Sequence, residues 1–295
     1  MLSMPNTTQS SFRWSGKDNE WLHNSKPRFL LRHAGPAKRS ANASCRDRKP
    51  GIESAVSNFR DHFDIVTAES PQLMEDVFAL RYQVYCEETG FENPADFPDR
   101  VEYDDYDKRS VHSLLQHVRT GLDAGTVRLV IPEEGELASL PLHEVTDHPF
   151  FRDEKRFPAD SVAEVSRFAI SRGFRRRLDE FPSPSAAGTY DVEREKALKL
   201  QEKRVLPHIT LGLFIAMVKM SHEQGIKTWF CVMEKALVRL LARYSLHFEA
   251  IGPSVEYHGE RQPCYADIDQ FLKRLHREQP GIWNLITQEG KYSRF

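Results

Sequence analysis

Three arginines interrupt segments that are otherwise apolar. Arg81 lies within a helix expected over residues 70–90, Arg128 within the strand "GTVRLVIP", and Arg167 within the strand "VAEVSRFAIS". A guanidinium group that is buried in a core destabilises the fold unless a carboxylate pairs with it. A single arginine in such a segment is more often a surface residue whose stem lies along apolar neighbours. Three of them predict a buried charge network, so the fold must bring acidic side chains to these positions.

The stretch "EYDDYD" contains the nearest acids, and it directly precedes an apolar strand over 111–118. Its E-x-D-x-x-D spacing selects Glu102, Asp104 and Asp107 as partners of the arginines, whereas Asp105 does not fit the spacing and is expected to face water. A solvated acidic loop, a pocket for a cationic substrate and a carboxylate metal site remain alternatives. An EF-hand is excluded, because the alternating acids, the glycine and the final glutamate of that loop are missing.

Strand alternation predicts which side chains share a face around Arg167. Successive residues of a strand point to opposite sides of the sheet. Glu164, Ser166 and Phe168 are therefore expected on one face, and Arg167 on the other face with Val165 and Ala169.

The order of the expected elements predicts an α+β fold. Strands are expected over 62–68, 111–118, 125–132, 162–171, 227–234, 247–252 and 263–268, and helices over 70–90, 208–224, 235–245 and 269–278. Antiparallel hairpin strands come first and a β-α-β pair comes later, which indicates a mixed sheet of about seven strands flanked by helices. No strand is followed by G-x-G-x-x-G or a Walker loop, so a doubly wound nucleotide fold is disfavoured.

Composition divides the chain into three parts and excludes some functions. Residues 1–57 are rich in Lys, Arg, Ser and Asn and predict a disordered basic extension that could touch a membrane surface. A domain is expected over 58–280, with a polar insertion at about 174–207 and a tail over 281–295. The net charge of −2 over 295 residues argues against nucleic-acid binding.

The cysteines and the hydropathy pattern bear on the cellular location. Four cysteines are scattered without a CxxC pair, which argues against a zinc site or a disulfide scaffold and favours the cytoplasm. No stretch reaches the roughly 18–20 apolar residues of a membrane span. Cys86 is interpreted as a small buried hydrophobe rather than a reactive thiol.

Four motifs together resemble those of a known family. "RYQVYCEETGF", "EYDDYD", "GTVRLV" and "AEVSRFAI" resemble the ordered signature of acyl-homoserine-lactone (autoinducer) synthases, which are acyltransferases of the GNAT superfamily. The positions that match in order are Arg81, Tyr85, Glu102, Asp104, Asp107, Arg128, Glu164 and Arg167; Phe91 stands where that signature has Trp. With "SRGFRRR" added, the chain over about 63–268 resembles more closely the PEP-CTERM/exosortase-associated acyltransferases and the N-acyl amino acid synthases.

The resemblance implies a fold and a donor. It implies a GNAT sheet that splays between its fourth and fifth strands, here 162–170 and 227–233, with the acyl-pantetheine arm between them. Enzymes of this superfamily that use coenzyme A carry a glycine-bearing loop after the fourth strand, and that pattern is absent here. A basic turn stands in its place, formed by Arg172, Arg175, Arg176 and Arg177. This turn fits an acidic acyl carrier protein as donor, although an exposed turn balanced by Asp179 and Glu180 is the plainer interpretation.

The resemblance also implies direct transfer of a long acyl chain from acyl carrier protein to the amino group of an amino acid. Glu164 is the candidate base, and Arg128 or Arg167 would bind the acceptor carboxylate unless both arginines are scaffold. Backbone N–H groups of residues 168–170 would hold the oxyanion. Substrate contacts are expected from Arg81, Tyr85, Phe91, Glu102, Asp104, Asp107 and Phe168. No bound cofactor or metal is expected.

Two alternatives remain open. One is synthesis of an acyl-homoserine lactone from S-adenosylmethionine, and the other is a non-catalytic module that binds acyl chains or carrier protein.

Overall fold

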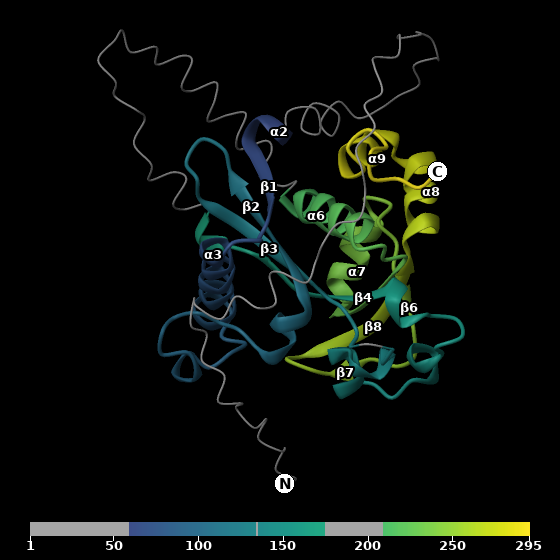
Figure 1. Cartoon of the computed structure of the whole chain (residues 1–295), viewed down its shortest axis with the longest axis horizontal. Coiled ribbons are helices and arrows are strands. Elements are labelled where there is room, and N and C mark those ends of the chain that lie inside the picture. The colour runs from purple at the N-terminus through teal and green to yellow at the C-terminus, as the bar shows by residue number, and fades with distance from the viewer. Residues whose placement is uncertain (1–58, 134, 175–208) are drawn as a thin grey trace, which may run out of the picture.

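The computed structural model describes residues 59–133, 135–174 and 209–295 (Figure 1). The predicted extension over 1–57 lies outside the described residues, as does nearly all of the predicted insertion. Arg175, Arg176 and Arg177 of the basic turn also lie outside them.

The described residues form a mixed α+β fold, as predicted, and its one sheet has eight strands where about seven were expected. The strands are β1 (Phe63–Thr67), β2 (Ser110–His117), β3 (Asp123–Val130), β4 (Val162–Ile170), β5 (Thr228–Glu234), β6 (Glu249–Ala250), β7 (Val255–Glu256) and β8 (Glu260–Asp267). Their spatial order is β1-β2-β3-β4-β5-β8-β6, and β7 pairs with β8. Only the β4–β5 pair is parallel among these strands.

The helices are α2 (Phe59–His62), α3 (Pro71–Tyr82), α6 (Ile209–Glu223), α7 (Lys235–Ala242), α8 (Ile268–Glu278) and α9 (Pro280–Ile286). The start of α3 follows from its sequence, because the Ser70 side chain accepts the N–H of Leu73 and Pro71 occupies the first turn. The single helix expected over 70–90 is not continuous: α3 is followed by a π-helical turn, η2 (Gln83–Glu88). Residues 281–295, expected as a tail, include most of α9, whose Ile282 and Leu285 are buried in the main core.

The two faces of the sheet are covered differently. Adjacent strand residues point to opposite sides, and Leu114 packs in the cluster of α3 whereas Leu115 packs in the cluster of α6. On the face of α3, the segment between β3 and β4 adds a third apolar cluster that includes Val130, Phe151 and Phe230. Figure 1 shows α3 on one side of the sheet and α8 and α9 toward the other side.

The predicted splay between β4 and β5 is confirmed. Their parallel register contains only three pairs and ends at Glu164 and Phe230. Beyond that point β5 continues to pair with β8 as far as Glu234 and Arg261. The end of β4 therefore separates from the end of β5.

A β-bulge at Arg167 corrects the predicted alternation. Arg128 pairs with Ser166, but Thr126 pairs with Ala169, so β4 has one more residue than β3 across this interval. Arg167 absorbs the extra residue with a φ of 48°, as is common where a bulge redirects a side chain. The prediction that Arg167 faces away from Ser166 is therefore wrong. Phe168 instead turns to α6, with its ring 5.9 Å from that of Phe214.

No helix among the described residues is long and apolar enough to cross a membrane.

Candidate active site

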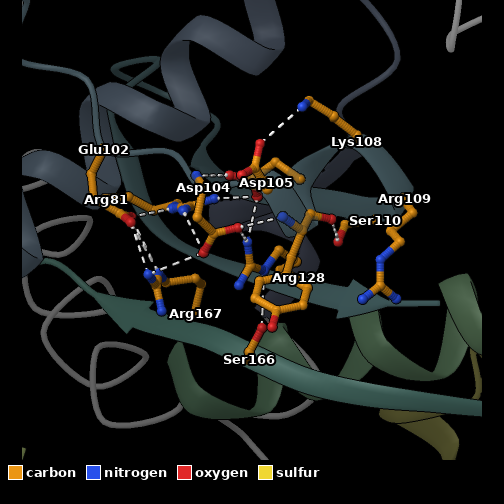
Figure 2. A network of polar contacts seen from close by, with 12 residues as sticks. Arg81, Glu102, Asp104, Asp105, Lys108, Arg109, Ser110, Arg128, Ser166 and Arg167 are labelled. Carbon is orange, nitrogen blue, oxygen red and sulfur yellow. Dashed lines mark hydrogen bonds and ion pairs between the residues drawn. The ribbon is translucent and has the colours of Figure 1, made fainter. Parts of the chain in front are cut away.

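The three arginines converge on the three predicted carboxylates, and Figure 2 shows these arginines beside Glu102 and Asp104. Arg81, at the end of α3, donates through Nε to Glu102 Oε2 at 2.5 Å and through Nη1 to Asp107 Oδ1 at 2.7 Å. Arg128 Nη1, on β3, lies 2.6 Å from both Asp104 Oδ1 and Asp107 Oδ1. The predicted charge network is thus confirmed.

Arg167 completes this network from the bulge of β4. Its Nη2 lies 2.9 Å from Glu102 Oε1 and 3.2 Å from Asp104 Oδ2. The side chain of Arg128 is 2% exposed and also donates through Nε to Ser166 Oγ, whereas Arg167 is 18% exposed. Arg128 is therefore held inside the scaffold, and Arg167 lies at the rim.

Local folding of "EYDDYD" aims the acids inward. Residues Asp105–Arg109 form a short 3-10 helix, η4, which Asp104 caps by accepting the N–H of Tyr106, while Asp107 Oδ2 accepts the N–H of Asp104. This reciprocal capping turns Asp104 and Asp107 toward the arginines. Asp105 is 55% exposed and pairs with Lys108, so its predicted outward position is confirmed. The alternative of a solvated loop is wrong for Glu102 and Asp107, which are buried.

The arginines keep the carboxylates ionised. Burial opposes the charged form of Glu102, but Arg167 and Arg81 outweigh it and lower the pKa of Glu102 to about 2. Burial also opposes the charge on Asp104, yet the neighbouring guanidinium groups lower its pKa too. The folded pKa of Glu102 is below its unfolded value of about 4.3. The network therefore stabilises the fold above pH 4.3, and that contribution is lost as the pH falls toward 2.

Sequence reasoning missed His112, which lies on β2 beside the network. Its ring is 1% exposed, and its Nε2 is 3.6 Å from Asp107 Oδ1. Neither ring nitrogen has a hydrogen-bond partner among the described residues. Burial lowers the pKa of His112 to about 4, so the ring is neutral near neutral pH. Its place on β2 opposite Arg128 could have been read from the hairpin register.

Glu164 is the candidate base, and it lies where β4 and β5 separate. It is 5% exposed, and its Oε2 accepts the N–H of Leu142 at 2.7 Å. Burial raises the pKa of Glu164 to about 8, although the Leu142 hydrogen bond and the charge of Arg128 act in the opposite direction. The predicted oxyanion donors, the N–H groups of residues 168–170, lie in the part of β4 beyond its last pair with β5.

The rim of the network carries aromatic side chains. The guanidinium of Arg167 lies 5.3 Å from the centre of the Tyr85 ring, and that ring lies 6.5 Å from the ring of Phe91. Glu92, which sequence reasoning missed, lies 3.7 Å from Arg167 Nη2. Burial raises the pKa of Glu92. An arginine, a carboxylate and two aromatic rings thus meet at this edge.

The start of the predicted basic turn is bound by an acid of η2. Glu88 Oε2 accepts the N–H of Arg172 at 2.7 Å, and Glu88 Oε1 accepts the N–H of Gly173 at 2.9 Å. A Cβ at Gly173 would lie 3.1 Å from Glu88 Oε1 and 2.9 Å from the side-chain amide of Gln83, so a larger residue there would displace the ends of these two side chains. The side chain of Glu88 thus occupies the first two amides that follow Ser171.

The Cys86 thiol and the acidic side chains bear on two other kinds of chemistry, nucleophilic catalysis and metal binding. Burial raises the pKa of Cys86 to about 11, which keeps its thiol protonated. Among the described residues, no group of three or more His, Cys, Asp or Glu side chains could hold a metal ion.

One family model matches part of the chain. Residues 80–179, about a third of the chain, match the family model described as "Acetyltransferase (GNAT) domain". None of the curated proteins compared with the chain matches it.

Several solved structures are similar to this chain. TofI in a ternary complex with an inhibitor and MTA has 20% identity and a TM-score of 0.48 over 75% of this chain and 99% of that chain. The AHL synthase LasI has 17% identity and a TM-score of 0.47 over 73% and 94%. FeeM, an N-acyl amino acid synthase from uncultured soil microbes, has 12% identity and a TM-score of 0.45 over 74% and 97%. All three similarities are weak by both measures.

Every arginine and carboxylate of the charge network lies between residues 80 and 179, the segment that matches the acetyltransferase (GNAT) domain.

Proposed function

We propose that the protein is a GNAT-type acyltransferase that moves a long-chain acyl group from acyl carrier protein to the amino group of an amino acid. One observation carries this proposal: β4 and β5 separate beyond Glu164 and Phe230, beside a buried charge network, in a sheet whose β4 belongs to the matched domain. Strand edges that separate in this way can pair with the amides of an extended pantetheine arm.

The proposed reaction is direct aminolysis of a thioester. The amine nitrogen forms a C–N bond with the acyl carbon, the C–S bond breaks, and the proton lost by the amine passes to Glu164 and then to the leaving thiolate. An α-amino group has a pKa of about 7.7–8.0, close to the value of about 8 for Glu164. Such a match suits a general base that works near neutral pH.

The acceptor is proposed to bind at the rim beside Arg167. Arg128 is buried and bonded to Asp104, Asp107 and Ser166, which supports a scaffold role for it. Arg167 is more exposed and faces Glu92, so this pair offers a cation to the acceptor carboxylate and an anion to its ammonium group.

Glu88 supports a carrier-protein donor over coenzyme A. The Glu88 carboxylate already accepts hydrogen bonds from the amides of Arg172 and Gly173. Burial opposes the charge of this carboxylate, but these bonds and the one from the Gln83 side chain outweigh burial and lower the pKa of Glu88. A pyrophosphate that approached these amides would meet a negative charge and find both donors occupied. A carrier-protein thioester has no pyrophosphate.

Replacement of Glu88 is predicted to change the donor preference. In Glu88→Gln the negative charge is lost, so the ratio of kcat/KM for acyl-coenzyme A to that for acyl-pantetheine should rise about tenfold. Glu87→Gln is the control, because Glu87 is exposed and pairs with Arg100 instead. An equal ratio in the wild type and in both variants would contradict a role for Glu88 in donor choice.

The proposed function is tested by mixing the protein with long-chain acyl-acyl carrier protein and each amino acid, and separately with S-adenosylmethionine. Released thiol is measured together with the product mass, and an N-acyl amino acid is expected. A homoserine-lactone product would support the alternative synthase, and no thiol release with any acceptor would favour the binding module. The exosortase association and the cytoplasmic location remain predictions.

A further inference from the structure

The turn between β7 and β8 touches the loop that carries Phe91, although this loop leads from η2 toward β2 on the β4 side of the splay and the turn lies on the β5 side. The Phe91 ring lies 5.9 Å from the ring of His258, and the guanidinium of Arg261 lies 5.4 Å from the centre of the Phe91 ring. From the other side, Tyr85 O accepts the N–H groups of Phe91 and Glu92 at 2.8 and 3.1 Å. Phe91 is thus held between η2 and the hairpin of β7 and β8.

Each nitrogen of the Arg261 guanidinium group makes a hydrogen bond or an ion pair. Its Nη1 lies 2.6 Å from Glu234 Oε1 at the end of β5, and its Nε and Nη2 donate to the backbone oxygens of Tyr257 and His258. In addition to these bonds, the guanidinium group makes a cation–π contact with the Phe91 ring. Arg261 therefore ties the separated end of β5, the hairpin turn and the Phe91 loop together.

The turn itself adopts a conformation that L-residues rarely adopt. His258 has a φ of 50°, Gly259 has a φ of 96°, and the N–H of Tyr257 donates to Gly259 O at 3.0 Å. A non-glycine residue with a positive φ persists where its surroundings hold it. The two bonds from Arg261 to this turn are part of what holds it.

We propose that Arg261 is a positioning residue for the acceptor, and that it acts by clamping Phe91. The clamp fixes the loop in which Glu92 follows Phe91, and so fixes the carboxylate that faces Arg167 at 3.7 Å. Without Arg261 the loop that carries Phe91 and Glu92 moves. The acceptor then binds more weakly, whereas the rate of its reaction with the thioester is unchanged. This inference rests on the proposed acyl transfer for its kinetic part only.

The first test is kinetic. Arg261→Ala should raise the KM for the amino acid about fivefold and leave kcat within about twofold, since a stacked guanidinium contributes about 1 kcal/mol. Arg261→Lys, which keeps the charge but loses the planar face, should behave similarly and serves if the alanine variant folds poorly. In a Phe91→Leu background the Arg261 substitution should have no further effect on KM.

The second test needs no activity. Amide hydrogen exchange of residues 89–93 should be about fivefold faster in both Arg261 variants than in the wild type. Lys235→Ala is the matched control, because Lys235 pairs with Glu260 on the same hairpin. Its exchange and KM should equal those of the wild type.

The clamp would be overturned if the amides of residues 89–93 exchanged at the wild-type rate in both Arg261 variants. It would also be overturned if the Arg261 and Phe91 substitutions had additive effects on KM. If the wild type releases no thiol from any donor, the proposed function fails, and the exchange comparison alone decides whether Arg261 holds Phe91.

Discussion

Glu164→Gln is expected to lower kcat by about 10²- to 10⁴-fold while the protein stays folded, because the amide cannot accept the proton of the amine. Glutamine has the shape of glutamate and can still accept the N–H of Leu142. Activity is measured as thiol release from the acyl donor at saturating acceptor. Glu144→Gln is the control, since Glu144 is a neighbouring acid that bonds to Tyr106 and is exposed.

The pH dependence separates this role from a structural one. With a pKa of about 8, Glu164 gains its charge as the pH rises through that value, so wild-type kcat should rise to a plateau above it. Stability should change in the opposite direction. The folded pKa lies above the unfolded value of about 4.3, so stability falls as the pH rises from 4.3 to 8. Glu164→Gln should lose this dependence of stability on pH, and full activity in this variant would remove Glu164 from the mechanism.

Arg128→Ala is expected to destabilise the protein by about 3–5 kcal/mol, which corresponds to a melting temperature lower by about 10 °C. The substitution leaves Asp104 and the buried Asp107 short of a partner, and it leaves Ser166 Oγ without its donor from Arg128. Thermal unfolding followed by circular dichroism measures the effect. Arg128→Lys should recover only part of the loss, since an ammonium group cannot reach all three partners as the planar guanidinium does.

The matched control for this prediction is Arg100→Ala. Arg100 is 69% exposed and pairs with Glu87, and exposed ion pairs contribute about 0–1 kcal/mol. Its melting temperature should therefore be close to that of the wild type. A melting temperature unchanged in Arg128→Ala would show that the network does not need this arginine.

The charge network could be predicted because burial of an arginine leaves few solutions. Arg81 and Arg128 stand among apolar neighbours, and "EYDDYD" is the acidic cluster nearest to their elements. Its spacing also distinguished Asp105 from the other three acids, and Asp105 pairs with Lys108 at the surface. The order of the strands and helices was predicted from hydrophobic periodicity. The separation of β4 from β5 was predicted from the family resemblance.

The parts that could not be predicted depend on distant contacts. Alternation assumes an unbroken register, so it misplaced Arg167 and Phe168 around a bulge that no residue type marks. Likewise, nothing in the sequence marks the change from α3 to the π-helical turn that carries Tyr85. The contact of Arg261 with Phe91 joins segments 170 residues apart (261 − 91), and local patterns carry no information on it.

The wide sequence separation within the charge network affects how the chain folds. Glu102 joins Arg81, 21 residues earlier, to Arg167, 65 residues later. Closing loops of this size costs chain entropy before the ion pairs can compensate for it. A nascent chain that ends before β4 therefore has its acids in place but lacks one of their three arginines. The last cation arrives only when the bulge of β4 docks, so the network reports the docking of β4 on β3 rather than formation of the first strands.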